Sequence, residues 1–564
     1  MQRYSLRKLG PRASWIAVAA SLAVLLAVAA AIGVGSGPRE AKQPENGIQQ
    51  EQSFSRPEGS SQFRPAYHLT PEKEWMNDPQ RPFLLDGVWH YYYLYNADHP
   101  EGNGTEWFHV TSTDLVHWKN EGVAIEKFKN GLGDIETGSA VVDTENTAGF
   151  GKDAVIAVLT QQDKGVQRQS LFYSTDKGHS FKSYDGNPVM DNPGAEHWRD
   201  PKIILDEANG QWVMALAEGE KIGFYTSHDL KEWRYASAFE RKGLGILECP
   251  DLFQLDVDGD PAKRTWVLAA SANGSEEGRT TGVAYWTGRW DGTRFTPADE
   301  QHQWLDAGSD FYAAVTWDDP RLPENERMAS RKAIGWMNNW TYARKLPTSD
   351  WQGGADSLVR DIRLKTVGGK PSLVSTPAEA LSALEGTTQA VADRRITQNG
   401  IVQDGTAEGG TAENGAADLP VPANGAYRLD VAFERRPDDD GTEALLKLGS
   451  GGADFATIGY NFKDETAFVA RAAVVPGVEP LGPVFTDRRT ASSPPRGGQT
   501  QGRGTVELTV FVDYSSVEVF VNGGEQSFTS LVFPRGGQHT INAATAGGSM
   551  ALKSFTYTPM ATAG

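Results

Sequence analysis

The chain contains a single cysteine, Cys249, among 564 residues, so it can form no internal disulfide and gives no cysteine-based signal of its redox compartment. Positive charge is in deficit as well, because 73 acidic residues outnumber 54 basic ones and the formal net charge is -19. Such a chain repels nucleic acid phosphates, so a nucleic acid partner is disfavoured and a neutral or cationic one is favoured. The ten histidines show no metal-ligand spacing, which disfavours a metal-dependent enzyme such as a polysaccharide lyase.

Long amphipathic helices are missing before residue 370, and a strand-rich pattern takes their place. A strand-like run, a Ser-x-Asp turn and an aromatic residue recur at Ser112, Ser174 and Ser227, about every 50 to 60 residues. This spacing is typical of a propeller blade built from four strands. The sequence therefore predicts an all-β protein with a five-bladed β-propeller over residues 63–375, with a sandwich of short strands as the alternative.

A change in composition marks the end of the predicted propeller. Residues 376–425 form a connecting segment that opens with a short helical candidate, capped by Thr376, and becomes rich in Gly, Ala, Asp and Thr. Alternating apolar and polar residues then predict a β-sandwich domain over residues 426–560. Such a domain either supports the propeller or binds carbohydrate, and the sequence leaves both open.

The N-terminus has the pattern of an export segment. Four basic residues precede an uncharged, alanine-rich run of about 20 residues, which is long enough to span a bilayer and also suits a cleavable signal. We therefore expect residues 1–36 to be a signal sequence or a membrane anchor and residues 37–62 to be a linker. Both interpretations predict a secreted or cell-surface protein.

Three short clusters of acid and proline are the strongest signal of function. Each leads directly into an apolar, strand-like run: Asn77-Asp78-Pro79, Arg199-Asp200-Pro201 and Glu248-Cys249-Pro250-Asp251. Equivalent strand starts in different blades converge near the axis of a propeller, so we expect the three carboxyl groups to share one site. Cleavage of a glycosidic bond with retained configuration needs one carboxylate as nucleophile and one carboxylic acid as proton donor. Asp-Pro is also a common turn pair, but three acid and proline clusters in register favour a glycosidase.

Together these clusters and several other motifs resemble glycoside hydrolase family 32, the β-fructofuranosidases that include invertases, inulinases and levanases. The resemblance runs from about residue 63 to near the C-terminus, and its motifs are Tyr67-His68-Leu69-Thr70-Pro71, Trp75-Met76-Asn77-Asp78-Pro79, Arg199-Asp200-Pro201, Glu248-Cys249-Pro250-Asp251, Asp310-Phe311-Tyr312-Ala313, Gly335-Trp336-Met337 and the run from Val512 to Phe520.

This resemblance implies a five-bladed propeller followed by a sandwich, and retaining cleavage of fructofuranosides without a metal or another cofactor. It implies that Asp78 is the nucleophile, Glu248 the general acid/base and Asp200 a stabiliser of fructosyl hydroxyls. Arg199 beside Asp200 is expected to keep that carboxyl charged. The residues expected to bind substrate are Trp75, Asn77, Arg81, Trp107, Glu136, Ser139, Arg199, Tyr312 and Trp336.

Departures from the common family pattern indicate the substrate. Most members have Asp-Pro-Asn-Gly, whereas here Asp78 is followed by Pro79-Gln80-Arg81-Pro82. The next aromatic strand reads Tyr93-Leu94-Tyr95-Asn96, where a Gln usually follows. Together with residues 102–107 they resemble endo-acting levanases, which release short pieces from β-2,6-linked fructan. Arg81 is then expected to contact a second sugar, and its alternative is a surface arginine in a turn.

Glu136 raises a rival outcome, because the family usually has an aromatic residue before the Thr-Gly or Ser-Gly pair. An extra carboxylate there is able to bind a sugar hydroxyl or to help deprotonate it. The second action resembles a levan fructotransferase, which forms a cyclic difructose dianhydride by intramolecular transfer. We expect hydrolysis, with transfer as the alternative. A non-catalytic fructan-binding protein is a third possibility, but it is expected to lack at least one of the three carboxyl groups.

Overall fold

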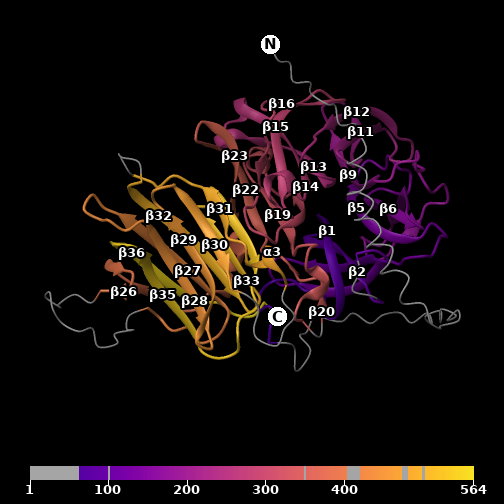
Figure 1. Cartoon of the computed structure of the whole chain (residues 1–564). Helices are drawn as coiled ribbons and strands as arrows, with labels where there is room; N and C mark the ends of the chain where they lie inside the picture. The colour runs from indigo at the N-terminus through magenta and orange to yellow at the C-terminus, as the bar shows by residue number, and fades with distance from the viewer. Residues whose placement is uncertain are drawn as a thin grey trace, which may run out of the picture. The chain divides into compact units, whose positions relative to one another are not determined.

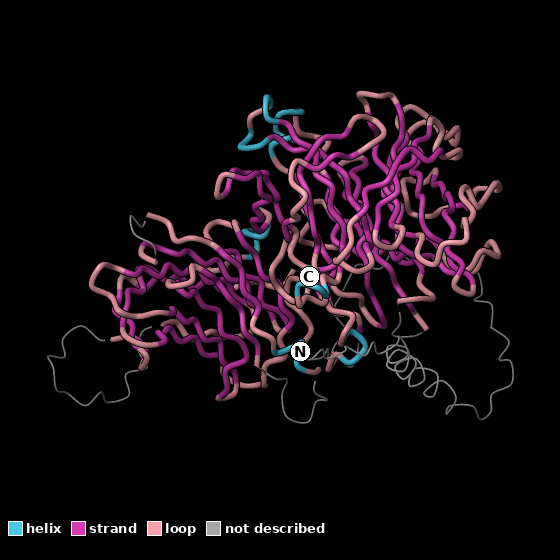
Figure 2. The backbone as a smooth tube through the Cα atoms, turned by 45° about the horizontal axis from the view of Figure 1, so that its top comes forward, coloured by secondary structure: helices cyan, strands magenta, loops and turns pink. Residues whose placement is uncertain are grey.

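The computed structural model describes residues 62–98, 102–348, 351–402, 419–472, 481–497 and 502–563. Strands make up nearly all of its regular structure, and the described helices are short (Figure 2). The expected export segment, and the expected linker up to residue 61, lie outside these residues and stay predictions. In the described part of the chain, no helix is both long and apolar enough to cross a membrane.

Five sheets follow one another along the chain before residue 378 (Figure 1). The first holds β1 (Glu74–Leu85), β2 (Val88–Asn96), β3 (Glu106–Ser112), β4 (Lys119–Ile125) and β20 (Trp351–Gln352). The second holds β5 (Asp134–Asp143), β6 (Ala154–Asp163), β7 (Val166–Ser174) and β8 (Lys182–Ser183). The third holds β9 (Arg199–Asp206), β10 (Gln211–Ala217), β11 (Lys221–Ser227) and β12 (Arg234–Glu240).

The fourth sheet holds β13 (Leu247–Asp256), β14 (Arg264–Ala272), β15 (Val283–Trp290), β16 (Phe295–Pro297) and β17 (Gln303–Trp304). The fifth holds β18 (Tyr312–Trp317), β19 (Arg331–Met337), β21 (Ala355–Asp356), β22 (Arg360–Val367) and β23 (Lys370–Pro377). The helical turns that the structure describes along the whole chain are η1 (Val257–Gly259), η2 (Pro261–Lys263), η3 (Ser275–Glu277), α2 (Glu324–Ala329), η4 (Ala343–Lys345), η5 (Glu379–Leu384) and α3 (Pro483–Thr486).

Apolar side chains fill the space between every two neighbouring sheets, and this closes the ring. Separate buried clusters join sheets one and two, two and three, three and four, and four and five. A further cluster joins the fifth sheet back to the first, where the rings of Trp89 and Trp317 pack edge to face. The five sheets are therefore the blades of a propeller, as predicted.

The repeated Ser-x-Asp phrase has the same structure in the first three blades. Ser112, Ser174 and Ser227 each end the third strand of a blade and donate a hydroxyl hydrogen bond to the Asp two residues later. The Asp in turn accepts backbone N–H groups of the following residues. This turn fixes the approach of the outermost strand, which explains its recurrence once per blade.

Two further sheets form the predicted β-sandwich. One holds β24 (Gln389–Val391), β25 (Arg394–Thr397), β26 (Gly400–Ile401), β27 (Tyr427–Arg435), β32 (Gly504–Asp513), β33 (Ser516–Val521), β34 (Gln526–Leu531) and β36 (Ser549–Pro559). The other holds β28 (Glu443–Ser450), β29 (Ala453–Asn461), β30 (Thr466–Arg471), β31 (Arg489–Ser492) and β35 (His539–Ala546). Their inner faces share one buried apolar core.

Part of the expected connecting segment belongs to this sandwich. The strands β24 and β25 pair with β36, and β26 pairs with β25. These strands are two to four residues long, so their alternation is too brief to predict from sequence. The helical candidate is also shorter than expected, because Thr376 and Pro377 end β23 and the turn η5 begins at Glu379.

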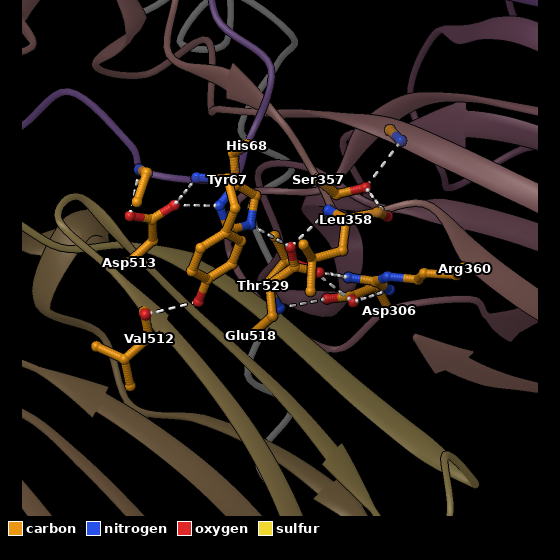
Figure 3. Close-up of polar contacts among 12 residues, drawn as sticks. Tyr67, His68, Asp306, Ser357, Leu358, Arg360, Val512, Asp513, Glu518 and Thr529 are labelled. Carbon is orange, nitrogen blue, oxygen red and sulfur yellow. Dashed lines mark hydrogen bonds and ion pairs between the residues drawn. The ribbon is translucent and has the colours of Figure 1, made fainter. Parts of the chain in front are cut away.

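Buried charges connect the chain before β1 with the sandwich and the fifth blade (Figure 3). His68 binds two sandwich carboxylates, with its Nδ1 2.8 Å from Asp513 and its Nε2 2.9 Å from Glu518. Glu518 also accepts a hydrogen bond of 2.5 Å from Arg360 in β22, and Arg360 donates to Asp306 at 2.8 Å. All these side chains are buried, so the network has almost no contact with solvent.

This network makes stability depend on pH. Burial lowers the pKa of His68, but hydrogen bonds to Asp513 and Glu518 outweigh burial and raise it from 6.5 to about 9. The folded state therefore binds the proton more tightly than the unfolded state. The resulting stabilisation is fully present below pH 6.5 and is lost as the pH rises through 9. A shift of this size corresponds to roughly 3 kcal/mol.

We expect His68→Gln to lower the denaturant midpoint most at about pH 6, with the gap to wild type closing near pH 10. Above pH 9 both side chains are neutral, so the variant loses little there. Unfolding curves at three pH values across this range measure the gap. A gap of constant size would show that His68 does not carry the extra proton.

Candidate active site

The first strand of every blade contains a β-bulge near its start. The strands β1, β5, β9, β13 and β18 each contact the next of the set around the ring, so they surround the propeller axis. In each one, two residues face a single residue of the neighbouring strand: Asn77 with Asp78, Glu136 with Thr137, Asp200 with Pro201, Cys249 with Pro250, and Ala313 with Ala314. Bulges re-aim side chains, and this ring of bulges turns several polar groups towards one another.

Backbone strain is concentrated in the same ring. Asp200, Cys249 and Ala313 all have positive φ angles, of 62°, 46° and 50°. A non-glycine residue pays about 1–3 kcal/mol for such a conformation. Three strained residues at equivalent bulges mark the axis of the propeller as the functional region.

The carboxyl group of Asp78 is held by three donors. Its Oδ2 accepts hydrogen bonds from the Thr137 hydroxyl at 2.6 Å and, more weakly, from the Cys249 thiol at 3.5 Å. Its Oδ1 accepts one from the Asn77 amide at 3.1 Å. Burial raises the pKa of Asp78 and the charge of Glu248 adds to this, while the three donors lower it.

Asp200 lies beside Asp78, with the Cys249 thiol between them. The Cys249 sulfur is 3.7 Å from the Oδ2 atom of Asp200, which also accepts the backbone N–H of Cys249 at 3.0 Å. Burial raises the pKa of Asp200, and the charges of Glu248 and Asp78 act in the same direction against Arg199. The expectation that Arg199 keeps Asp200 charged is thus weakened, since the guanidinium is 4.0 Å from Asp200 and turns to Glu248 instead.

Glu248 completes the cluster. Arg199 donates two hydrogen bonds to its Oε1, at 2.6 and 3.2 Å, and the Tyr312 hydroxyl donates one to its Oε2 at 2.5 Å. About a quarter of the Glu248 side chain is exposed, against 5% for Asp200. The structure therefore brings all three predicted catalytic carboxyl groups together. The Glu248 side chain is more open to solvent than that of Asp200.

Tryptophans form one wall beside these carboxyl groups. The rings of Trp75, Trp336 and Trp340 pack together, and Tyr312 and Cys249 belong to the same cluster. Trp75 and Trp336 are fully buried, and their indole N–H groups donate to Asn77 and to the Gly353 carbonyl. Only Trp340 of the three is partly exposed. Trp340 is therefore the tryptophan of this cluster whose ring keeps some surface open to solvent.

The opposite wall contains Glu136 and Trp107. Trp107 is fully buried and donates its indole N–H to the backbone carbonyl of Glu136 at 3.0 Å, so it positions the bulge of β5 and has no open face for a sugar. The Glu136 carboxyl accepts a hydrogen bond from the Gln162 amide at 3.0 Å. Both residues therefore lie at the site, but only Glu136 offers it a functional group.

Two residues expected to bind substrate lie elsewhere. Ser139 is fully buried and joins β5 to β9, since it donates to the Pro201 carbonyl and accepts the Ile203 N–H. Arg81 lies 3.7 Å from Asp318 and acts electrostatically on Lys202 and Arg331. The expected contact of Arg81 with a second sugar therefore has no support.

Comparison with known proteins agrees with this geometry. The family model described as "Glycosyl hydrolases family 32 N-terminal domain" matches residues 68–377, and "Glycosyl hydrolases family 32 C terminal" matches residues 384–559. The chain belongs to glycoside hydrolase family 32. It is therefore a glycoside hydrolase, built from the propeller and sandwich described above.

Relatives within family 32 include two proteins named "Levanbiose-producing levanase". The one from Bacillus subtilis is 42% identical over 498 residues, which cover 88% of this chain and 90% of that protein. The one from Geobacillus stearothermophilus is 51% identical over 323 residues, which cover 57% of this chain and 80% of that protein. Among solved structures, the fructofuranosidase from Schwanniomyces occidentalis in complex with fructose superposes with a TM-score of 0.77 at 26% identity and covers 89% of this chain and 99% of its own.

Several residues of this family 32 enzyme were missed by sequence reasoning. Thr137 donates to Asp78, Trp340 packs against the cluster that contains Trp336 and Tyr312, and the Cys249 thiol lies within hydrogen-bond distance of two carboxyl groups. Gly102 belongs with them, because a Cβ there would lie 2.5 Å from the Trp340 ring. The spacing of Trp336 and Trp340 in the sequence could have indicated an aromatic cluster at the site. The role of Thr137 depends on a bulge in β5 that its sequence does not predict.

Proposed function

We propose that this enzyme hydrolyses levan, the β-2,6-linked fructan, through a covalent fructosyl-enzyme intermediate and with retention of configuration. The observation that carries the proposal is the meeting of Asp78, Asp200 and Glu248 at the bulges of three innermost strands. The similarity to two proteins named as levanases favours levan over other fructans.

The reaction follows from the positions of the carboxyl groups. Asp78 attacks the anomeric carbon of a fructosyl unit, while Glu248 donates a proton to the leaving glycosidic oxygen. A water molecule then gives its proton to Glu248 and attacks the fructosyl carbon, which frees Asp78. Asp200 accepts hydrogen bonds from the fructosyl hydroxyls, and Trp340 supplies an aromatic face to the sugar.

The mode of attack is a separate question. The sequence pattern predicted internal, endo-type cleavage, and this stays a prediction. The name of the two relatives specifies levanbiose as the product, which favours release of a disaccharide from a chain end. Intramolecular transfer is the alternative to hydrolysis, and both share the first half-reaction.

Incubation of the purified protein with levan, inulin and sucrose in separate reactions tests the proposal. We expect levan to be cleaved best, with levanbiose as a product identified by its mass. A product lighter by one water molecule would indicate the transferase, and longer fragments that appear early would indicate internal attack. Cleavage of inulin or sucrose with no action on levan would contradict the proposed substrate.

A further inference from the structure

Glu136 occupies a position in the site that the reaction above does not use. It lies in the bulge of β5 with Thr137, and the two residues together face Thr160 of β6. Thr137 points to Asp78, whereas the Glu136 side chain reaches the Gln162 amide. Glu136 is only 6% exposed and lies among other carboxyl groups. Its charge state therefore decides whether it donates or accepts a hydrogen bond.

Charge around Glu136 is strongly unbalanced. Asp134 on its own strand, Asp78 on β1 and Asp200 on β9 all act on Glu136, and Arg199 is the one cation among its principal electrostatic partners. Arg199 is already committed, because it donates two hydrogen bonds to Glu248 and contacts the His197 ring. Lys127 acts on Asp134, but the other four carboxyl groups, those of Glu136, Asp78, Asp200 and Glu248, lie around one guanidinium and cannot all ionise at a moderate cost.

Hydrogen bonds decide which of these groups stays neutral. Asp134 accepts backbone N–H groups from Gly104 and Gln162, Asp200 accepts one from Cys249, and Asp78 has three side-chain donors. Glu136 accepts a single bond, from a neutral amide, and none from the backbone of the described residues. Its charged form is thus the least supported in the group.

Burial and the neighbouring charges act in the same direction. Burial raises the pKa of Glu136 well above its usual value, and the charges of Asp134 and Asp200 raise it further against a smaller effect of Arg199. Gln162 donates to Oε1, so the proton belongs on Oε2. In the described structure Oε2 has no hydrogen-bond partner, and it is not cut off from solvent.

We infer that Glu136 acts as a neutral carboxylic acid that donates a hydrogen bond from Oε2 to an oxygen of the bound fructan. This inference rests on the proposed function. A protonated Glu136 is unable to take a proton from a sugar hydroxyl, so it does not assist intramolecular transfer. Glu136 is instead a residue that selects and positions the substrate, and water remains the acceptor.

Three variants separate a neutral donor from a charged acceptor or base. Glu136→Gln keeps a neutral donor of the same shape, so we expect kcat/KM on levan oligosaccharides to stay within about threefold of wild type. Glu136→Ala leaves a substrate hydroxyl unpaired, so we expect a loss of about 10- to 100-fold, mainly through KM. Glu126→Gln serves as control, because Glu126 is exposed and forms a surface ion pair with Lys129, and it should leave kcat/KM unchanged.

The pH profile provides a readout that a purely structural role would not move. As the pH rises, Glu136 ionises and loses its donor, while a Gln at this position does not. The ratio of wild-type to Glu136→Gln activity should therefore fall with rising pH, and the effect of Glu248 on both profiles cancels in that ratio. Thermal midpoints of all variants confirm that they are folded.

The outcomes that overturn the inference are distinct from those that overturn the function. If wild type cleaves levan but Glu136→Gln is as poor as Glu136→Ala, the residue works as a charged group and the inference is wrong. If wild type forms difructose dianhydride and Glu136→Gln does not, Glu136 is a base and the inference is again wrong. If wild type leaves levan intact, the proposed function fails, and the variants are compared on the fructan that wild type does cleave.

Discussion

Asp78→Asn should lower the rate of levan cleavage by at least about 10⁴-fold while the protein stays folded. The amide cannot form the ester to the anomeric carbon, and the site offers no other carboxyl group in the same position. Thr137 and Cys249 both donate to Oδ2 and still find an oxygen acceptor on Asn, whereas the Asn77 amide loses its acceptor at Oδ1. Initial rates of sugar release, with the fold checked by thermal unfolding, measure both effects.

Asp78→Asn should also change the stability of the protein, in a direction that follows from the pKa of Asp78. The pKa of Asp78 is raised in the folded state, so at neutral pH its charge costs free energy there, and Asn removes that cost. We therefore expect the thermal midpoint of Asp78→Asn to equal or exceed that of wild type. Asp114→Asn is the matched control with the opposite behaviour, because turn N–H groups, the Ser112 hydroxyl and the His117 ring all contact the Asp114 carboxylate and lower its pKa. Near-normal activity of Asp78→Asn would refute the nucleophile.

Proline explains why three of the five bulges were visible in the sequence. Pro79, Pro201 and Pro250 cannot donate to a strand ladder, so a proline at the start of an apolar run signals a bulge or an edge. The acid beside each proline then identified the catalytic candidates. The bulges of β5 and β18 contain no proline, and their residues, such as Thr137 and Ala313, are ordinary in a regular strand. Sequence therefore predicted the carboxyl groups but not the complete ring.

A bulge without a sequence signal also explains why the position of Arg81 was not predicted. Side chains alternate between the faces of a strand, and each bulge resets that alternation. The strand β1 contains a second irregularity between Gln80 and Phe83, so Arg81 itself lies in a bulge and reaches Asp318. Counting from Asp78 along a regular strand cannot reveal this. Gln80 also has a structural role, because it joins the bulge of β1 to that of β5 through Gly138.

Arg360→Met should destabilise the protein by about 3–5 kcal/mol, because it leaves the buried Asp306 without its cation and removes one of the two cations, Arg360 and His68, that contact Glu518. Asp306 and Glu518 are both fully buried, and each receives a charged hydrogen bond from the Arg360 guanidinium. Arg363→Met on the same strand is the control. Arg363 is partly exposed and donates to the Thr376 hydroxyl at 3.1 Å, so its loss should cost less than about 1 kcal/mol.

The pH dependence of this loss separates charge from packing. Burial raises the pKa of Asp306 and of Glu518, and at present Arg360 outweighs burial and lowers both. Without Arg360 the folded-state pKa of Asp306 rises most, while His68 still lowers that of Glu518, so the destabilisation is complete at neutral pH and shrinks as acid protonates Asp306. Calorimetry across this range should also resolve two transitions in the variant, because Arg360 joins the fifth blade to β33 and β34 of the sandwich. A loss that is independent of pH, in a single transition, would mean that the arginine stem contributes by packing and that its charge does not hold the two domains together.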